Sequence, residues 1–173
     1  PDLPFVMGME VAGSIDAIGE GVTGLAVGQR VAAFAGQGGL ADFGCFPAER
    51  CMPLPDAMPF EHAAGFMISY GTSHVALAHR ARLAQGEALL VLGAAGGVGL
   101  TAVEIGAQLG ARVIAVARGA EKLAVAKAAG ASVLVDSDSP DLKAELKALG
   151  GVDVVYDAVG DPIASLALRT LKP

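Results

Sequence analysis

A glycine-rich turn between an apolar run and a helix-like segment constrains the fold of this chain more than any other feature. Residues 88–92 are apolar throughout, which is typical of a buried parallel strand. Four glycines follow within seven residues: Gly93, Gly96, Gly97 and Gly99. Residues 100–109 then carry apolar side chains at the spacing of one helix face. Strand, glycine turn and helix in this order predict the first unit of a parallel α/β sheet.

The turn has the chemistry of a phosphate-binding loop. Glycine lets the backbone approach a ligand closely because no Cβ is in the way, and a helix N-terminus offers N–H groups and a positive dipole end to a pyrophosphate. Gly96 and Gly99 occupy the last two positions of the dinucleotide fingerprint G-x-G-x-x-G, with Ala94 in place of its first glycine. A turn that only joins packed elements is the alternative. The predicted contacts to a dinucleotide are Ala95, Gly96, Gly97, Val98 and Gly99.

The next strand indicates which dinucleotide is bound. Residues 110–117 are apolar apart from Arg112, and they end about twenty residues past the glycines, where the adenosine ribose is bound in this fold. An acidic residue there would bind the ribose hydroxyls and repel a 2′-phosphate. Here Ala117 is followed by Arg118, with Lys122 one turn later. The two cations predict NADPH as the cofactor, unless they are ordinary solvated charges at the start of a helix.

The second half of the chain continues the alternation of helices and strands. We predict helices at 121–129, 141–149 and 161–171, and strands at 132–135 and 152–157. Together with the two preceding strands, these predict an α/β fold with a truncated doubly wound parallel sheet, the Rossmann arrangement. Val159 follows the fourth strand, at the edge where this fold places its cofactor.

The first half has a different character. Strand-like patterns occupy residues 10–18, 27–34 and 40–46, with a short edge piece at 51–54. Prolines then end the pattern, and helix-like spacing occupies residues 60–68 and 70–83. An antiparallel, barrel-like unit thus passes through helices into the α/β unit, and we place the two domains at residues 1–78 and 79–173.

Composition excludes several classes of partner. The 173 residues carry a net charge of −6 without a basic run, so a nucleic-acid partner is not expected. The uncharged stretches are interrupted by glycine and are too short for a membrane span. Cys45 and Cys51 form no C-x-x-C pair, and the start of the chain does not have the pattern of a signal peptide, which predicts a cytoplasmic protein. Because the chain begins without methionine and ends within the α/β alternation, we interpret it as a fragment.

Five segments carry a resemblance to a known family: residues 3–13, 19–31, 70–72, 93–99 and 153–160. In order and spacing they resemble the medium-chain dehydrogenase/reductase superfamily, specifically its zinc-free quinone oxidoreductases similar to zeta-crystallin. The resemblance implies part of a GroES-like catalytic domain followed by part of a Rossmann NADP-binding domain, with the active site between them. It also implies that further strands of both domains lie outside these residues.

The resemblance argues against a metal site. Zinc-dependent members of the superfamily carry a histidine ligand within Gly-His-Glu, whereas this chain has Met9 at the matching position. A thioether is a poor ligand for Zn²⁺, and the four closely spaced cysteines of the structural zinc lobe are also absent. His62, His74 and His79 do not share ligand spacing. We therefore expect no bound metal.

The activity that the resemblance implies is metal-free hydride transfer from NADPH to a quinone or an α,β-unsaturated carbonyl. Thr72 matches the family position near the nicotinamide, although a helix-capping role explains a threonine there equally well. The sequence indicates no general acid, so the catalytic residues stay unassigned. We expect the full-length form to be a homodimer and the isolated fragment to be inactive.

Two other functions remain open, and a third is disfavoured. An enoyl reductase acting on thioesters, either free or as a module of a synthase, would have the same fold and the same hydride chemistry. A crystallin-like protein that binds NADPH without turnover belongs to a different class. A methyltransferase is disfavoured, because its ribose-binding strand normally ends in an acidic residue and this strand ends in Ala117 and Arg118.

Overall fold

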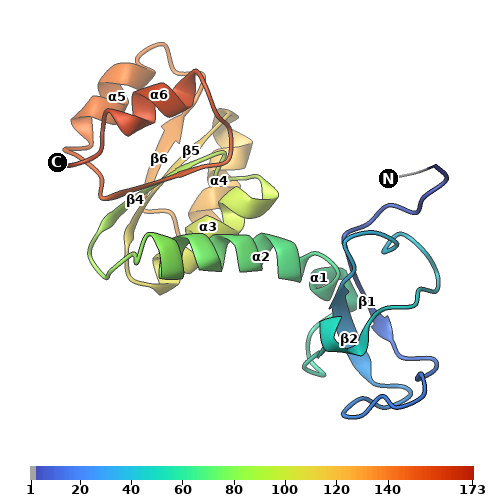
Figure 1. Ribbon diagram of the computed structural model, residues 1–173. Helices are drawn as coiled ribbons and strands as arrows, with labels where there is room; N and C mark the ends of the chain where they lie inside the picture. The colour runs from blue at the N-terminus through green and yellow to red at the C-terminus, as the bar shows by residue number, and fades with distance from the viewer. Residues whose placement is uncertain (1–2) are drawn as a thin grey trace. The chain divides into compact units, whose positions relative to one another are not determined.

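The computed structural model describes residues 3–173, which form two units whose boundary along the chain falls within a helix (Figure 1). The first unit ends at Gly71 and the second begins at Thr72. The domain boundary proposed from the sequence, after residue 78, falls later in the same helical connection. No helix among the described residues is long and apolar enough to cross a membrane.

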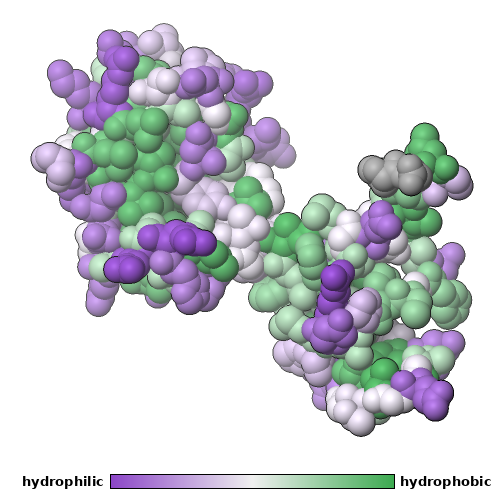
Figure 2. All heavy atoms as spheres, viewed as in Figure 1, coloured by the Kyte–Doolittle hydropathy of each residue, from purple (hydrophilic) through white to green (hydrophobic). Residues whose placement is uncertain are grey.

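The first unit contains a three-stranded antiparallel sheet in the order β1-β2-β3. Its strands are β1 (Glu10–Ser14), β2 (Arg30–Phe34) and β3 (Cys51–Pro53). The central strand β2 buries three consecutive side chains, and the unit presents apolar side chains over much of the face seen at the right of Figure 2. This sheet confirms the predicted antiparallel part of the fold.

The strand predicted at residues 40–46 is wrong. These residues form a loop, in which the side chains of Leu40 and Phe43 are 69% and 78% exposed. The backbone N–H of Leu40 donates to the carbonyl of Met7 at 2.9 Å, so the start of the loop pairs with an irregular segment and not with the sheet. The apolar alternation that suggested a strand therefore has no core face to cover.

Two short helices and a π-helical turn follow the sheet: α1 (Phe60–Ala63), α2 (Phe66–His74) and η2 (Val75–Arg80). The single helix predicted at 60–68 is wrong, because the backbone N–H of Gly65 bonds back to the carbonyl of His62 and closes α1. The turn before α1 is fixed by Arg30, which donates to the carbonyls of Pro55 and Asp56 at 3.2 and 2.6 Å.

The second unit is built on a four-stranded parallel sheet in the order β6-β5-β4-β7, which confirms the predicted doubly wound fold. Its strands are β4 (Ala88–Leu92), β5 (Arg112–Ala117), β6 (Val133–Asp136) and β7 (Val154–Asp157). Its helices are α3 (Gly97–Gln108), α4 (Gly119–Ala128), α5 (Leu142–Ala148) and α6 (Ile163–Leu168).

Helices cover both faces of this sheet (Figure 1). Leu89 and Val91 of β4 point into the core that includes α3 and α4. Leu90 and Leu92 of the same strand point into the core shared with α5 and α6. Because both faces of the sheet are buried, its central strands are continuous apolar runs in the sequence. For this reason the bounds of β4 could be predicted from the sequence.

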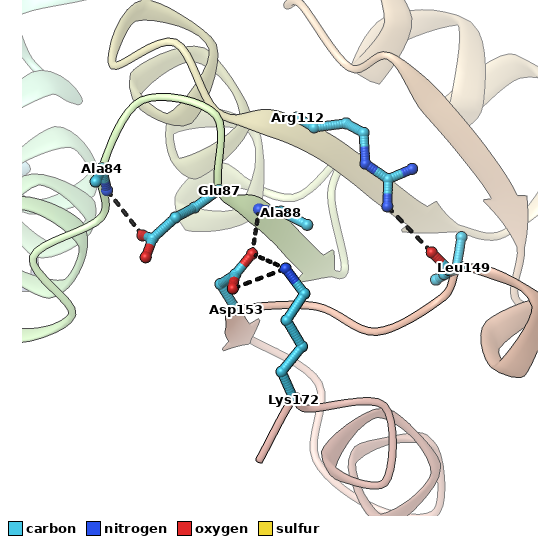
Figure 3. A network of polar contacts seen from close by, with 7 residues as sticks. All are labelled: Ala84, Glu87, Ala88, Arg112, Leu149, Asp153 and Lys172. Atoms are coloured by element: carbon cyan, nitrogen blue, oxygen red, sulfur yellow. Dashed lines mark hydrogen bonds and ion pairs between the residues drawn. The ribbon is translucent and has the colours of Figure 1, made fainter.

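Polar contacts hold together the amino ends of the parallel strands (Figure 3). A carboxylate oxygen of Asp153 accepts the backbone N–H of Ala88 at 2.8 Å, and Lys172 donates to the same oxygen at 2.7 Å. The bond from Ala88 is the main reason that the pKa of Asp153 is lowered, and Lys172 adds to the shift. These contacts fix β7 against β4 at the edge opposite to the glycine turn.

Candidate functional site

The glycine turn leads directly from β4 into α3. Gly96 is the N-cap of α3, with φ −82° and ψ 167°, and its own N–H donates to the carbonyl of Gly93 at 2.9 Å. The carbonyl of Gly96 accepts the N–H of Leu100 at 2.7 Å, which closes the first helical turn. As at any helix start, the first N–H groups of α3 have no partner within the helix and are available to a ligand.

The two fingerprint glycines have different surroundings. A Cβ built on Gly96 would meet a single neighbouring atom, the carbonyl oxygen of Gly93, at 3.3 Å. A Cβ on Gly99 would lie 2.1 Å from that same oxygen, well inside van der Waals contact. Gly96 is exposed and Gly99 is buried. Gly99 thus permits the close packing of α3 on the strand end, while Gly96 leaves space on the side of the turn open to a ligand.

A cavity of about 620 Å³ lies at the carboxyl edge of the sheet, beside this turn. Its volume is within the range of small-molecule and cofactor sites. The opposite wall is apolar, with Leu142 of α5 and Ile163 of α6. The sequence-predicted residues that line it are Ala95, Gly96, Gly97, Val98, Gly99, Arg118, Lys122 and Val159. An open glycine turn, a helix start and two cations on one cavity fit a dinucleotide that carries an extra phosphate.

Thr72 is the predicted site residue that does not line this cavity. It lies inside α2 and is exposed. A position near the end of the helix does not cap the helix start, so the capping role considered as an alternative is wrong. A contact between Thr72 and the nicotinamide stays a prediction.

The cavity also contains a carboxylate that sequence reasoning missed. Asp138 lies on the loop after β6 and forms an ion pair with Arg118, with 3.2 Å between Oδ1 and Nε. From the sequence, ribose-binding residues were expected only at the end of β5, the second strand of the parallel sheet along the chain. Parallel pairing of β6 with β5 places the end of the third strand beside it, so the acidic residues after residue 135 were the available signal.

Asp136 organises this part of the cavity edge. One oxygen of its carboxylate accepts the backbone N–H of Gly119 at 3.1 Å and that of Asp138 at 3.0 Å. The N–H groups of Asp138 and Gly119 are the main causes that lower the pKa of Asp136, with a smaller contribution from the charge of Arg118. The Asp136 carboxylate therefore links the start of α4 to the loop after β6.

A cluster of hydroxyl groups supports the glycine turn from behind. Ser73 is fully buried, and its hydroxyl donates to the carbonyl of Val98 at 2.8 Å. The same oxygen is 2.8 Å from the hydroxyl of Thr101 and 3.0 Å from that of Tyr156. Ser73 thus ties α2 to α3 and to β7, directly beneath a residue of the cavity wall.

Replacing Ser73 with alanine is expected to lower the free energy of unfolding by about 1–3 kcal/mol, because buried hydrogen-bonding groups then lose a partner. Chemical denaturation of the full-length protein measures this effect. Ser14→Ala, at an exposed serine at the end of β1, serves as a control for the loss of a hydroxyl. A stability equal to that of the unmutated protein would contradict the structural role given to this cluster.

The histidines lie in an arrangement that the sequence spacing did not reveal. The rings of His74 and His79 are 5.3 Å apart between centroids, because residues 75–80 form a π-helical turn.

Within the part of the chain that the structure describes, there is no group of three or more His, Cys, Asp or Glu side chains placed to hold a metal ion. Met9, which the family resemblance matches to the histidine ligand of zinc-dependent members, is 53% exposed.

Comparison with known proteins identifies the family. Residues 1–56 match the alcohol dehydrogenase GroES-like domain, and residues 97–173 match the zinc-binding dehydrogenase domain. A quinone oxidoreductase-like protein 2 homolog from Nematostella vectensis is 36% identical over 176 residues, covering 99% of this chain and 48% of that protein.

Two solved structures are similar over nearly the whole chain. The quinone oxidoreductase of Escherichia coli complexed with NADPH has a TM-score of 0.91 and 32% identity, covering 99% of this chain and 54% of that one. The CurK enoyl reductase has a TM-score of 0.89 and 32% identity, covering 98% and 52%. The chain thus spans about half the length of these relatives. With its two domain matches in this order, the chain belongs to the quinone oxidoreductase branch of the medium-chain dehydrogenase/reductase superfamily.

Proposed function

We propose that the full-length protein binds NADPH and transfers a hydride to a quinone or an α,β-unsaturated carbonyl without a metal. The observation that carries the proposal is the open face of Gly96 on a cavity that also contains Arg118 and Lys122. The similarity to a quinone oxidoreductase solved with NADPH supports the same conclusion. In this function the nicotinamide supplies the hydride, and the protein binds and orients the cofactor.

Each part of the cavity has a role in that binding. The N–H groups at the start of α3 bind the pyrophosphate, since the helix dipole favours negative charge there. Arg118 and Lys122 bind the 2′-phosphate through charge-assisted hydrogen bonds. Val159, on the loop after β7, contributes an apolar surface at the carboxyl edge of the sheet. The proton donor to the reduced product remains unassigned.

NADPH is expected to bind at least about tenfold more tightly than NADH, since one charge-assisted phosphate contact contributes about 1.4 kcal/mol or more. Replacing Arg118 with alanine should narrow this difference. Arg169→Ala is the matched control, because Arg169 follows α6 and does not line the cavity. Titrations of both cofactors against the full-length protein measure the ratio, and equal dissociation constants in the unmutated protein would refute the cofactor assignment.

Purified full-length protein is expected to hold far less than one zinc ion per chain, because Met9 stands at the position of the histidine ligand. Activity should survive incubation with a strong chelator. Elemental analysis before and after chelation measures the zinc content per chain, and NADPH oxidation measures the activity that remains. Stoichiometric zinc that is lost together with activity would show that the metal-free mechanism is wrong.

Enoyl reduction is the second candidate function, and the similarity to the CurK enoyl reductase favours it specifically. Both candidates share the cofactor site, so the substrate decides between them. NADPH oxidation should be measured with quinones and with crotonyl thioesters under the same conditions. Faster turnover of thioesters would favour the enoyl reductase, and NADPH binding without oxidation of any acceptor would favour a non-catalytic protein.

A further inference from the structure

The candidate cofactor site contains one carboxylate in direct contact with a phosphate-binding cation. We propose that Asp138 competes with the 2′-phosphate of NADPH for Arg118 and thereby limits the selectivity for NADPH over NADH. This inference rests on the proposed function, and it identifies a specificity-determining residue within the same cavity. Asp138 and Arg118 both line that cavity.

The backbone holds the two side chains as neighbours. The N–H of Ser137 donates to the carbonyl of Ala117 at 3.0 Å, which continues the pairing of β6 and β5 beyond the strand ends. The carboxylate of Asp136 then bridges the N–H groups of Gly119 and Asp138. These hydrogen bonds hold the backbone at Arg118 close to the backbone at Asp138. The ion pair therefore forms between side chains that are already positioned side by side.

The ion pair uses only part of Arg118. Asp138 contacts Nε of the guanidinium, and the two side chains are 74% and 61% exposed. A 2′-phosphate bound to the same guanidinium would bring a second anion to one cation. NADH carries a hydroxyl at that position and does not need the guanidinium, so the loss of the Asp138 ion pair is a cost to NADPH binding and not to NADH binding.

The expected size of the effect follows from this exposure. An exposed ion pair is weak, so freeing Arg118 from Asp138 to bind the 2′-phosphate corresponds to about a threefold change in affinity. Lys122 lines the same cavity and forms no ion pair within residues 3–173. A preference for NADPH therefore persists in the unmutated protein, but it is smaller than the two cations alone would give.

The test is Asp138→Asn in the full-length protein, with dissociation constants for NADPH and NADH measured by titration at low ionic strength. We expect the ratio of the NADH constant to the NADPH constant to rise about threefold, because Arg118 no longer gives up an ion pair to bind the phosphate, and the rise to shrink in high salt. Glu121→Gln is the matched control, because it removes one negative charge from the first turn of α4 but Glu121 does not line the cavity.

A second arm repeats the substitution in an Arg118→Ala background, where competition for Arg118 cannot occur. The rise in the ratio should then disappear. An equally large rise in that background, or an unchanged or lower ratio in Asp138→Asn alone, would overturn the inference while leaving NADPH binding intact. Failure of the unmutated protein to bind NADPH would instead refute the proposed function and the inference together.

Discussion

Gly99→Val is expected to lower the free energy of unfolding by about 3 kcal/mol or more, at the upper end of what overpacked cores show. The Cβ of any residue at this position would lie 2.1 Å from the carbonyl oxygen of Gly93 and 2.8 Å from its carbonyl carbon. Both are backbone atoms, so no side-chain rotation relieves the clash. Either α3 moves away from the end of β4 or the turn opens.

Denaturant melts of the full-length protein measure this loss, and NADPH titrations should show weakened binding as well. Gly99→Ala is a useful second variant, because it adds only the clashing Cβ. It should also be destabilised, because the Cβ alone would clash with the carbonyl of Gly93. Native-like stability in both variants would mean that Gly99 is not required for packing of α3.

Gly96→Val is expected to abolish NADPH binding, with the dissociation constant raised at least about a hundredfold, while stability changes little. The backbone at Gly96 has φ −82° and ψ 167°, which any residue adopts, and a Cβ there requires a shift of only a few tenths of an ångström from one carbonyl. The added side chain would instead occupy the space proposed for the pyrophosphate.

The comparison of the two variants is the informative result. If Gly96→Val unfolds the protein as severely as Gly99→Val does, the division of roles between these glycines is wrong. If Gly96→Val binds NADPH normally, the turn is not the pyrophosphate site. Melts and NADPH titrations on both proteins distinguish these outcomes.

The parts of the fold that the sequence predicted well are those determined by local pattern and complete burial. The strand predicted at residues 88–92 has the same bounds in the structure, because both of its faces are covered and every position must be apolar. The glycine turn was equally readable, since a strand, closely spaced glycines and a helix follow one another along the chain.

The parts that the sequence did not predict depend on contacts between distant segments. The apolar alternation at residues 40–46 resembled a strand, but only the folded structure shows that Leu40 and Phe43 face solvent. Ser73 contacts Val98 and Tyr156 across 25 and 83 positions of the chain. Asp138 meets Arg118 only because β6 pairs with β5. No pattern within a single segment of the sequence predicts contacts of this kind.

The two walls of the cavity have different capacities for evolutionary change. At its glycines the turn from Gly93 to Gly99 presents main chain, which a substitution alters by adding a side chain, and at Gly99 that side chain would clash with the carbonyl of Gly93. Arg118, Lys122 and Asp138 present side chains that can be exchanged without disturbing a strand or a helix core. Descendants of this sequence could therefore change the nucleotide they prefer at the end of β5 and on the loop after β6, while the turn proposed to bind the pyrophosphate, which all dinucleotides share, stays the same.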